Sequence, residues 1–229
     1  MPSHLPSLGR LSSTHSEGKG NFHIKIVVLG SPRVGKTAIV SQFLYSHFPE
    51  SYIATVDQLH RAEYEVKGFG PLILDILDTS GSHEFPVMKK LAIESADAFL
   101  LVFSLTDSES FEEVRRLRDE IIATKKFKLP PIVVAANKCD LDSMRVIKRE
   151  LTETIVTIDW ENGYVESSAK DDFNINTIFQ QLMVQIGVPY KIGSVIGNPK
   201  IRRKSLPAYP TSPALRDKVT PKRNSCAVS

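Results

Sequence analysis

A short segment near the N-terminus combines glycines, a lysine and a threonine at a spacing that suits phosphate binding. It reads Gly30-Ser-Pro-Arg-Val-Gly-Lys36-Thr37 and fits the pattern G-x-x-x-x-G-K-[S/T], between a β-branched run and apolar residues at helical spacing. Backbone N–H groups of such a loop can surround phosphate oxygens, while Lys36 supplies a point charge and the Thr37 hydroxyl suits Mg²⁺. The alternative is an ordinary glycine turn with an exposed lysine, which the flanking strand and helix disfavour.

A second pair of residues that could take part in binding follows the apolar run Leu72–Leu77. This run predicts a buried strand that delivers Asp78 to its carboxyl end, where a carboxylate can hold Mg²⁺ through water. Gly81, three residues later, could present a backbone N–H to a terminal phosphate. An aspartate after a strand is usually only a turn former, but its combination with the phosphate loop favours a role in binding.

Two further motifs could recognise a nucleotide base. Asn137-Lys-Cys-Asp140 follows the strand-like run Ile132–Ala136, and the Asp140 carboxylate can accept hydrogen bonds from guanine N1–H and from the 2-amino group. Adenine offers neither donor in that arrangement, so Asp140 would select guanine. Ser167-Ser-Ala-Lys170 follows the next strand-like run, and its backbone N–H groups could reach the guanine O6.

The elements that must position these motifs alternate along the chain. Strand-like runs occur at Phe22–Gly30, Leu72–Leu77, Ala98–Leu105, Ile132–Ala136 and Tyr164–Glu166. One apolar stripe predicts a helix entered by a capping box of Ser110 and Glu113, and another predicts a last helix around Ile175–Ile186. This order predicts a mainly parallel sheet covered on both faces, with its ligand beyond the carboxyl ends of the strands.

With the four motifs in this order, residues 23–188 resemble a Ras-superfamily small GTPase of the Ras subfamily. The Gly-Ser-His…Phe-Pro…Met pattern that begins at Gly81 is most similar to the Di-Ras and dexamethasone-induced Ras branches. The resemblance implies an α/β P-loop NTPase fold, with a six-stranded mainly parallel sheet, five flanking helices and disordered N- and C-terminal extensions. It also implies that the protein binds GTP, GDP and Mg²⁺ and acts as a GTP/GDP signalling switch that hydrolyses GTP.

The resemblance can be carried over residue by residue. It implies Mg²⁺ ligands at Thr37, Thr55 and Asp78, and participation in hydrolysis by Lys36, Thr55, Gly81 and Ser82. It implies that the nucleotide and its metal are bound by Gly30, Ser31, Pro32, Arg33, Val34, Gly35, Lys36, Thr37, Ala38, Phe48, Thr55, Asp78, Gly81, Asn137, Lys138, Asp140, Ser168, Ala169 and Lys170.

Two segments resemble the nucleotide-dependent switches of the family. Thr55 lies 25 residues after Gly30 and is similar to the switch I threonine, Phe48 is similar to the aromatic residue beside the guanine, and Gly81–Pro86 resembles switch II. Effector proteins would bind through Tyr52–His60 and switch II of a monomer, and exchange factors and GTPase-activating proteins are also implied. The sequence of Tyr52–His60 only partly resembles Ras, which leaves the effectors open.

Two departures from the family pattern predict slow hydrolysis. Ser82 stands where glutamine usually orients the attacking water, and Pro32 and Arg33 replace glycines that Ras has in its phosphate loop. Pro32 has no N–H to donate, and either side chain could crowd an arginine supplied by an activating protein. One alternative is hydrolysis rescued by another group, although His83 is a poor candidate because a histidine there is more often simply exposed. Another is an interaction scaffold that stays bound to GTP and hydrolyses negligibly.

Charge and composition divide the 229-residue chain into three parts. Its formal net charge of +3 combines nine basic residues and one acidic residue in 189–229, hence +8, with −5 for the rest. We expect a flexible extension over 1–22, a GTP-binding domain over 23–188 and a disordered basic tail over 189–229. The longest apolar runs are too short for a membrane span, the N-terminus lacks a secretory signal, and the two cysteines favour a reducing compartment.

The tail predicts attachment to the cytoplasmic face of the cell membrane. The chain ends Cys226-Ala-Val-Ser229, a C-a-a-X box that favours farnesylation of Cys226. A single lipid chain binds weakly, so anionic membrane lipids would supply the second attachment by attracting the basic residues. A nucleic-acid-binding arm is disfavoured by the C-a-a-X box and by the scarcity of aromatic residues among the cations. The sequence Arg202-Arg-Lys-Ser205 is a possible phosphorylation site whose modification would weaken membrane attraction.

Overall fold

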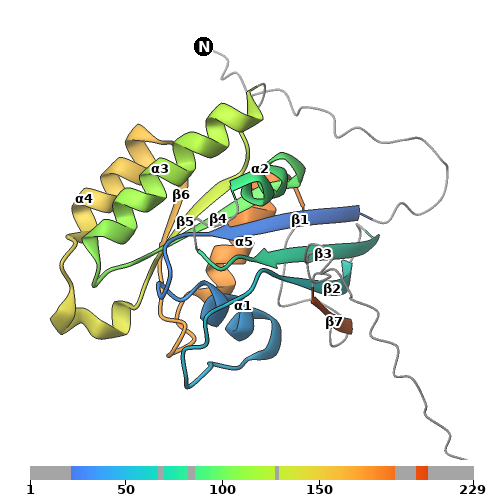
Figure 1. Ribbon diagram of the computed structural model, residues 1–229, viewed down its shortest axis with the longest axis horizontal. Helices are drawn as coiled ribbons and strands as arrows, with labels where there is room; N and C mark the ends of the chain where they lie inside the picture. The colour runs from blue at the N-terminus through green and yellow to red at the C-terminus, as the bar shows by residue number, and fades with distance from the viewer. Residues whose placement is uncertain (1–21, 67–69, 82–85, 127–128, 189–199, 206–229) are drawn as a thin grey trace, which may run out of the picture.

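The computed structural model describes residues 22–66, 70–81, 86–126, 129–188 and 200–205 (Figure 1). The strands are β1 (Phe22–Leu29), β2 (Gln58–Val66), β3 (Gly70–Asp78), β4 (Ala98–Ser104), β5 (Ile132–Asn137), β6 (Gly163–Glu166) and β7 (Lys200–Ser205). The helices are α1 (Lys36–Tyr45), α2 (Pro86–Ser95), α3 (Ser108–Lys125), α4 (Arg149–Thr154) and α5 (Ile175–Ile186). Two irregular turns, η1 (Cys139–Met144, 3₁₀) and η2 (Ile155–Asp159, π-helical), flank α4.

All strands belong to one sheet in the order β6-β5-β4-β1-β3-β2-β7. β1 pairs in parallel with β3 and β4, β5 pairs in parallel with β4 and β6, and β2 runs antiparallel to β3. Every residue of β4 and of β5 is buried, as expected of central parallel strands covered on both faces. The expected α/β fold, with five helices and mainly parallel pairing, is confirmed, and β7 adds a seventh strand to the six that were expected.

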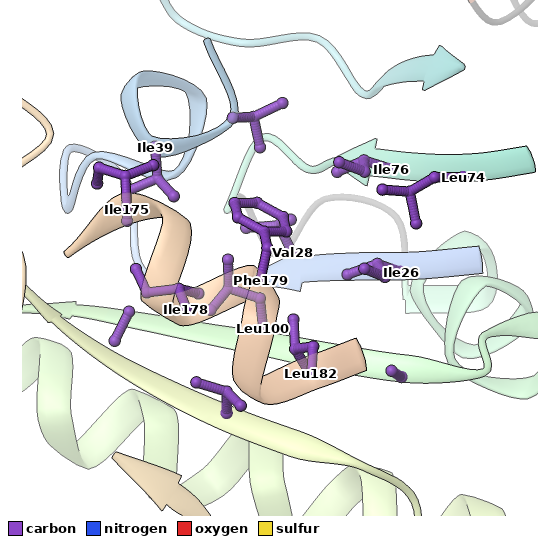
Figure 2. Packing of buried hydrophobic residues seen from close by; sticks show 14 of the residues in the cluster. Ile26, Val28, Ile39, Leu74, Ile76, Leu100, Ile175, Ile178, Phe179 and Leu182 are labelled. Carbon is purple, nitrogen blue, oxygen red and sulfur yellow. The ribbon is translucent and has the colours of Figure 1, made fainter. Parts of the chain in front are cut away.

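Two apolar layers hold the helices against the sheet. On one face, side chains of α1 and α5 pack on β1, β3 and β4; Figure 2 shows Ile178, Phe179 and Leu182 of α5 beside Val28 and Leu100. Phe179 also stacks on Phe43 of α1, with ring centroids 3.6 Å apart. The other face is covered by α2, α3 and the segment around η2. Helices on both faces leave the ends of the strands as the open part of the sheet, which is where a ligand can enter.

The start of α3 differs from the expected capping box. Asp107 is the N-cap residue, and its carboxylate accepts hydrogen bonds from the backbone N–H groups of Glu109 and Ser110. Ser110 lies inside the first turn, where its hydroxyl accepts from Ser104 N–H at 3.0 Å and donates to the carbonyl of Asp107 at 2.6 Å. The capping box of Ser110 and Glu113 is therefore wrong, because the helix begins one turn earlier at a residue that is equally suited to capping.

The seventh strand comes from a part of the chain that we expected to be disordered. β7 pairs antiparallel with β2, with Gln58 opposite Ser205 and Glu63 opposite Lys200. Disorder is expected from the sequence because this basic segment cannot bury enough apolar surface to fold alone. An edge strand such as β2 instead offers unpaired backbone N–H and C=O groups, which any extended segment can satisfy. In the part of the chain that the structure describes, no helix is long and apolar enough to cross a membrane.

A cluster of charged and polar side chains around one buried carboxylate ties the first three strands together. Asp75 of β3 is 5 % exposed, and its carboxylate accepts two hydrogen bonds from Arg61 of β2, at 2.7 and 2.6 Å. His23 of β1 contacts the same carboxylate, with Nε2 2.7 Å from Oδ2. Burial alone would raise the pKa of Asp75, but the hydrogen bonds and charges of Arg61 and His23 outweigh it and lower the pKa below its ordinary value.

Replacement of Asp75 by asparagine tests how much this cluster stabilises the sheet. The variant keeps the side-chain shape but removes the charge, so we expect a loss of about 2 kcal/mol in the free energy of unfolding at pH 7. The pKa of Asp75 is lower in the folded state than the unfolded value of about 3.9. The stabilisation is therefore present above that pH and is lost as the pH falls through the folded pKa, so the two urea unfolding curves should begin to approach each other below about pH 4 and coincide below the folded pKa.

The matched control is Asp119→Asn on α3, where the side chain is 68 % exposed and its ion pair with Arg118 lies at the surface. We expect this control to change the free energy of unfolding by no more than about 0.5 kcal/mol. Coincident curves for wild type and Asp75→Asn at pH 7 would show that the cluster contributes nothing.

Candidate functional site

One cavity of about 640 Å³ lies at the ends of β1, β3 and β5 and brings most of the sequence-predicted residues together. Its volume is within the range of small-molecule sites. The expected residues that line it are Arg33, Gly35, Lys36, Thr37, Ala38, Phe48, Thr55, Asn137, Lys138, Asp140, Ala169 and Lys170. The sequence interpretation missed these lining residues as ligands: Pro49, Glu50, Ser51, Tyr52, Ile53, Ser80 and Leu141. Their only signal in the sequence is that several lie beside predicted residues, as Pro49 follows Phe48, Ser80 precedes Gly81 and Leu141 follows Asp140.

The loop between β1 and α1 places a buried cation at the bottom of one end of the cavity. Lys36 is 5 % exposed, and its Nζ donates to the carbonyl oxygens of Gly30 at 3.0 Å and Ser31 at 2.9 Å. Burial lowers the pKa of Lys36 to about 8, although the charges of Asp78 and Asp57 act in the opposite direction. The ammonium is held by neutral carbonyl groups, an environment in which an anion would be a strong additional partner.

Glycine is required at two positions of this loop for steric reasons. Gly30 has φ +146°, and a Cβ there would collide with the carbonyl oxygen of Val102. Gly35 has φ +101°, and a Cβ there would meet the side-chain amide of Asn137. Of the other loop residues, Val34 is buried beneath the loop, and Pro32 is exposed.

Three oxygen-bearing side chains meet next to Lys36. The Thr37 hydroxyl donates to Asp78 Oδ2 at 2.7 Å, and the Thr37 and Thr55 hydroxyl oxygens are 2.8 Å apart. Asp78 is completely buried, and its Oδ1 has no hydrogen-bond partner among the described residues. Burial raises the pKa of Asp78 to about 6 despite the Thr37 hydrogen bond and the charge of Lys36, while the charge of Asp57 raises it further. An unpartnered carboxylate oxygen beside two hydroxyls is a donor set that fits a hard divalent cation.

Gly81 lies against the loop between β1 and α1. A Cβ at Gly81 would meet the Lys36 ammonium and would lie 2.6 Å from the carbonyl oxygen of Gly30. Next to it, the backbone N–H of Ser80 donates to Asp57 at 2.9 Å, which links the segment after β3 to the segment before β2. The sequence places Asp57 within the predicted effector surface Tyr52–His60, but an acidic side chain in a loop gives no signal of its contact with Ser80.

Asn137 connects the two ends of the cavity. Its side-chain N–H donates to the carbonyl of Val34 at 2.9 Å, and its Oδ1 accepts from the backbone N–H of Ala169 at 3.1 Å. The side chain is 2 % exposed, and both of its polar atoms are satisfied within the protein. Asn137 therefore positions the phosphate-binding loop and the loop after β6, a role that the motif alone did not reveal.

The far end of the cavity carries a fixed carboxylate. Asp140 Oδ1 accepts from the buried Ser168 hydroxyl at 2.7 Å, and Ser168 Oγ accepts in turn from Asp171 N–H at 3.1 Å. Lys138, just before η1, has φ +68° and lines the same region with Lys170. Asp140 lines the cavity, and a carboxylate has enough acceptor sites to accept further hydrogen bonds from donors on a planar ligand.

The predicted effector surface Tyr52–His60 is exposed before β2 and buried where it enters that strand. Ile53 and Val56 are 79 % and 82 % exposed, whereas His60 is 5 % exposed and lies 3.0 Å from the Tyr45 hydroxyl through its Nδ1. His60 therefore cannot belong to the predicted effector surface, because the alternation of β2 turns its side chain inward. Phe48 lines the cavity while remaining 37 % exposed.

Some predicted residues lie outside the described part of the chain. These are Ser82 and the rest of switch II up to residue 85, the extension 1–21 and Cys226. Ser205 ends β7.

Comparisons with known proteins agree with the geometry. The sequence profile of the Ras family matches residues 25–187. The chain is 39 % identical over 181 residues to the GTP-binding protein Rhes of Mus musculus, an alignment that covers 75 % of this chain and 68 % of that protein. It is 38 % identical over 189 residues to GTP-binding protein Rhes of Homo sapiens, covering 79 % and 69 %. The phosphate-binding loop, the hydroxyl–carboxylate cluster and the extent of these matches lead to one conclusion: the chain belongs to the Ras family of small GTPases.

Proposed function

We propose that this protein is a membrane-anchored small GTPase that alternates between GTP- and GDP-bound states and hydrolyses GTP slowly. The observation that carries the proposal is the convergence in one cavity of a buried ammonium, a hydroxyl–carboxylate cluster and a fixed carboxylate. These three features are complementary to phosphates, to a divalent cation and to a guanine base.

The residues at the phosphate end would bind without covalent chemistry. Lys36 would pair with phosphate oxygens, and the N-terminus of α1 would present its unpaired backbone N–H groups to them. Thr37, Thr55 and Asp78 would hold Mg²⁺, since Asp78 has an unpartnered oxygen and both hydroxyls lie next to it. Mg²⁺ supplies neutralisation of the charge that develops on the phosphates. Lys36 would stabilise the same charge from the protein side.

The switch would operate through contacts that depend on the γ-phosphate. Thr55 precedes β2, and Gly81 follows β3, so both sit on loops that leave adjacent strands. With GTP bound, the Thr55 hydroxyl and the Gly81 N–H would both be held at the phosphate end, and hydrolysis would release both loops. The exposed side chains of Tyr52, Ile53 and Val56 would then present different surfaces to effectors in the two states. Exchange factors and activating proteins would act on the same loops.

Asparagine in place of Asp140 tests the assignment of the base site. An amide cannot accept hydrogen bonds from both N1–H and the 2-amino group of guanine, but it can donate to the 2-carbonyl of xanthine. We expect the affinity for mant-GDP to fall by about 100-fold or more, with a gain for mant-XDP, as measured by fluorescence titration.

Asp142→Asn is the matched control for this variant. Asp142 lies two residues away in η1, but its side chain is 79 % exposed and pairs with Arg145 outside the cavity. The control should bind mant-GDP as the wild type does. Equal affinities of Asp140→Asn and wild type for mant-GDP would exclude Asp140 from the base site.

Slow hydrolysis is proposed from Ser82 and Pro32. A serine side chain is too short to orient water where a glutamine amide would reach, and Pro32 offers no N–H to the phosphates. The alternative remains a scaffold that stays bound to GTP with negligible hydrolysis. Thr37, Thr55 and Asp78 favour retained Mg²⁺-dependent chemistry over that alternative, because the metal that they would hold neutralises the charge that develops on the phosphates during hydrolysis.

Glutamine in place of Ser82 should partly restore the positioning of the attacking water. We expect the single-turnover rate of phosphate release from the GTP-loaded protein to rise by about tenfold. Ser143→Gln, an exposed serine of η1 outside the cavity, serves as the control and should keep the wild-type rate. A wild-type rate equal to that of a glutamine-bearing Ras protein would contradict slow hydrolysis, whereas no measurable wild-type turnover would favour the scaffold.

Membrane attachment is proposed from the C-terminal sequence. Cys226 would carry the prenyl group, and the basic residues of 189–229 would add electrostatic attraction to anionic lipids of the cytoplasmic leaflet. We also propose that the tail does not bind nucleic acid. The protein would act as a monomer at the cytoplasmic face of the cell membrane.

Serine in place of Cys226 removes the only thiol of the C-a-a-X box. We expect the full-length variant to move from the membrane pellet to the supernatant after cell fractionation, because the basic residues alone bind too weakly. Ser229→Leu is the matched control, since it keeps the cysteine and changes only the expected lipid from farnesyl to geranylgeranyl. An unchanged membrane fraction for Cys226→Ser would exclude prenylation as the anchor.

A further inference from the structure

A contact between two loops spans part of the nucleotide cavity. The guanidinium of Arg33, in the phosphate-binding loop, lies over the ring of Tyr52, with 5.1 Å from Cζ to the ring centroid. Both residues line the cavity that Lys36 and Thr37 also line. The distance lies within the range of an attractive cation–π interaction. The contact therefore joins the loop that would bind phosphates to the segment that leads to Thr55.

The backbone of Arg33 is in a conformation that is costly for its residue type. Its φ angle is +64°, in the left-handed region, where a side chain is disfavoured and glycine is not. Such an outlier next to a binding site is grounds for a functional hypothesis when the side chain makes a defined contact. At Arg33, that contact is the Tyr52 ring.

Tyr52 belongs to an exposed segment that precedes Thr55. Residues 50–54 are all exposed, and the Tyr52 side chain is itself 57 % exposed. Segments with few buried contacts open readily by local fluctuation. A contact from the phosphate-binding loop would therefore have a large effect on how often this segment moves away from the cavity.

We propose that Arg33 and Tyr52 form a latch across the phosphate end of the cavity that slows the release of a bound guanine nucleotide. This inference rests on the proposed function, since it requires the cavity to hold that nucleotide. Arg33 and Tyr52 act as positioning residues: the cation holds the aromatic ring, and the ring holds the segment before Thr55 over the ligand.

Release of mant-GDP from the full chain, chased with excess GTP, tests the latch. Arg33→Ala and Tyr52→Leu should each accelerate release by about two- to fivefold, the factor expected for an exposed cation–π contact. The double variant should be no faster than the faster single variant, because both substitutions remove the same contact. Tyr52→Phe keeps the aromatic ring, so its rate of mant-GDP release should be much closer to that of wild type than to that of Tyr52→Leu.

Two further variants separate the latch from other causes. Arg33→Gly removes the side chain and also relaxes the backbone at +64°, so it should release mant-GDP as fast as Arg33→Ala. Arg149→Ala removes the same charge from the exposed surface of α4, outside the cavity, and should keep the wild-type rate. Acceleration by Arg149→Ala would attribute the effect to net charge and overturn the latch.

The remaining outcomes also decide the proposal. If the effects of Arg33→Ala and Tyr52→Leu multiply in the double variant, each side chain acts separately on the nucleotide and the latch is wrong. If wild type retains mant-GDP but neither single variant accelerates its release, the latch fails while the proposed function stands. If wild type binds no guanine nucleotide, the proposed function fails and the latch fails with it.

Discussion

The two hydrogen bonds of the Asn137 amide hold the two ends of the cavity together. One reaches the carbonyl of Val34 and the other the backbone N–H of Ala169, so a single buried side chain fixes the distance between the phosphate-binding loop and the loop after β6. Both loops follow the carboxyl ends of parallel strands, but β1 and β6 are separated in the sheet by two other strands. Without a rigid link between them, the two ends of an elongated ligand could not be bound at once.

At the phosphate end of the cavity, the buried groups Lys36 and Asp78 lack enough opposite charge to stabilise their ionised forms. Burial shifts the pKa of Lys36 down and that of Asp78 up, so both groups are pushed toward their neutral forms. A polyphosphate and a divalent cation would reverse both shifts, because each would bring an opposite charge to a group that water no longer solvates. The proposed ligand and metal thus match the electrostatic requirement of these two side chains as well as the shape of the cavity.

The sequence was sufficient for the features that depend on local pattern and spacing. Apolar runs located β1, β3, β4, β5 and β6, and the motifs located Lys36, Thr37, Asp78 and Asp140 at the ends of those strands. The sequence was insufficient where a partner distant in the chain decides the outcome. The sequence of β2 is Gln-Leu-His-Arg-Ala-Glu-Tyr-Glu-Val, in which apolar and polar residue types do not clearly alternate. One reason is that Arg61 is partly buried by its ion pair with Asp75. The contact of Arg33 with Tyr52 could not be foreseen either, since it depends on a left-handed backbone angle that no motif encodes.

The pairing of β7 with β2 changes the mechanics of the proposed membrane attachment. Cys226 lies 38 residues beyond Val188 but only 21 residues beyond Ser205. Fully extended, those stretches would reach about 130 Å and about 70 Å, so the strand pairing nearly halves the tether between the folded body and a lipidated Cys226. It also moves the point of attachment from the end of α5 to the edge of the sheet beside Gln58, three residues after Thr55. A force on the tether would then act on the strand that follows switch I.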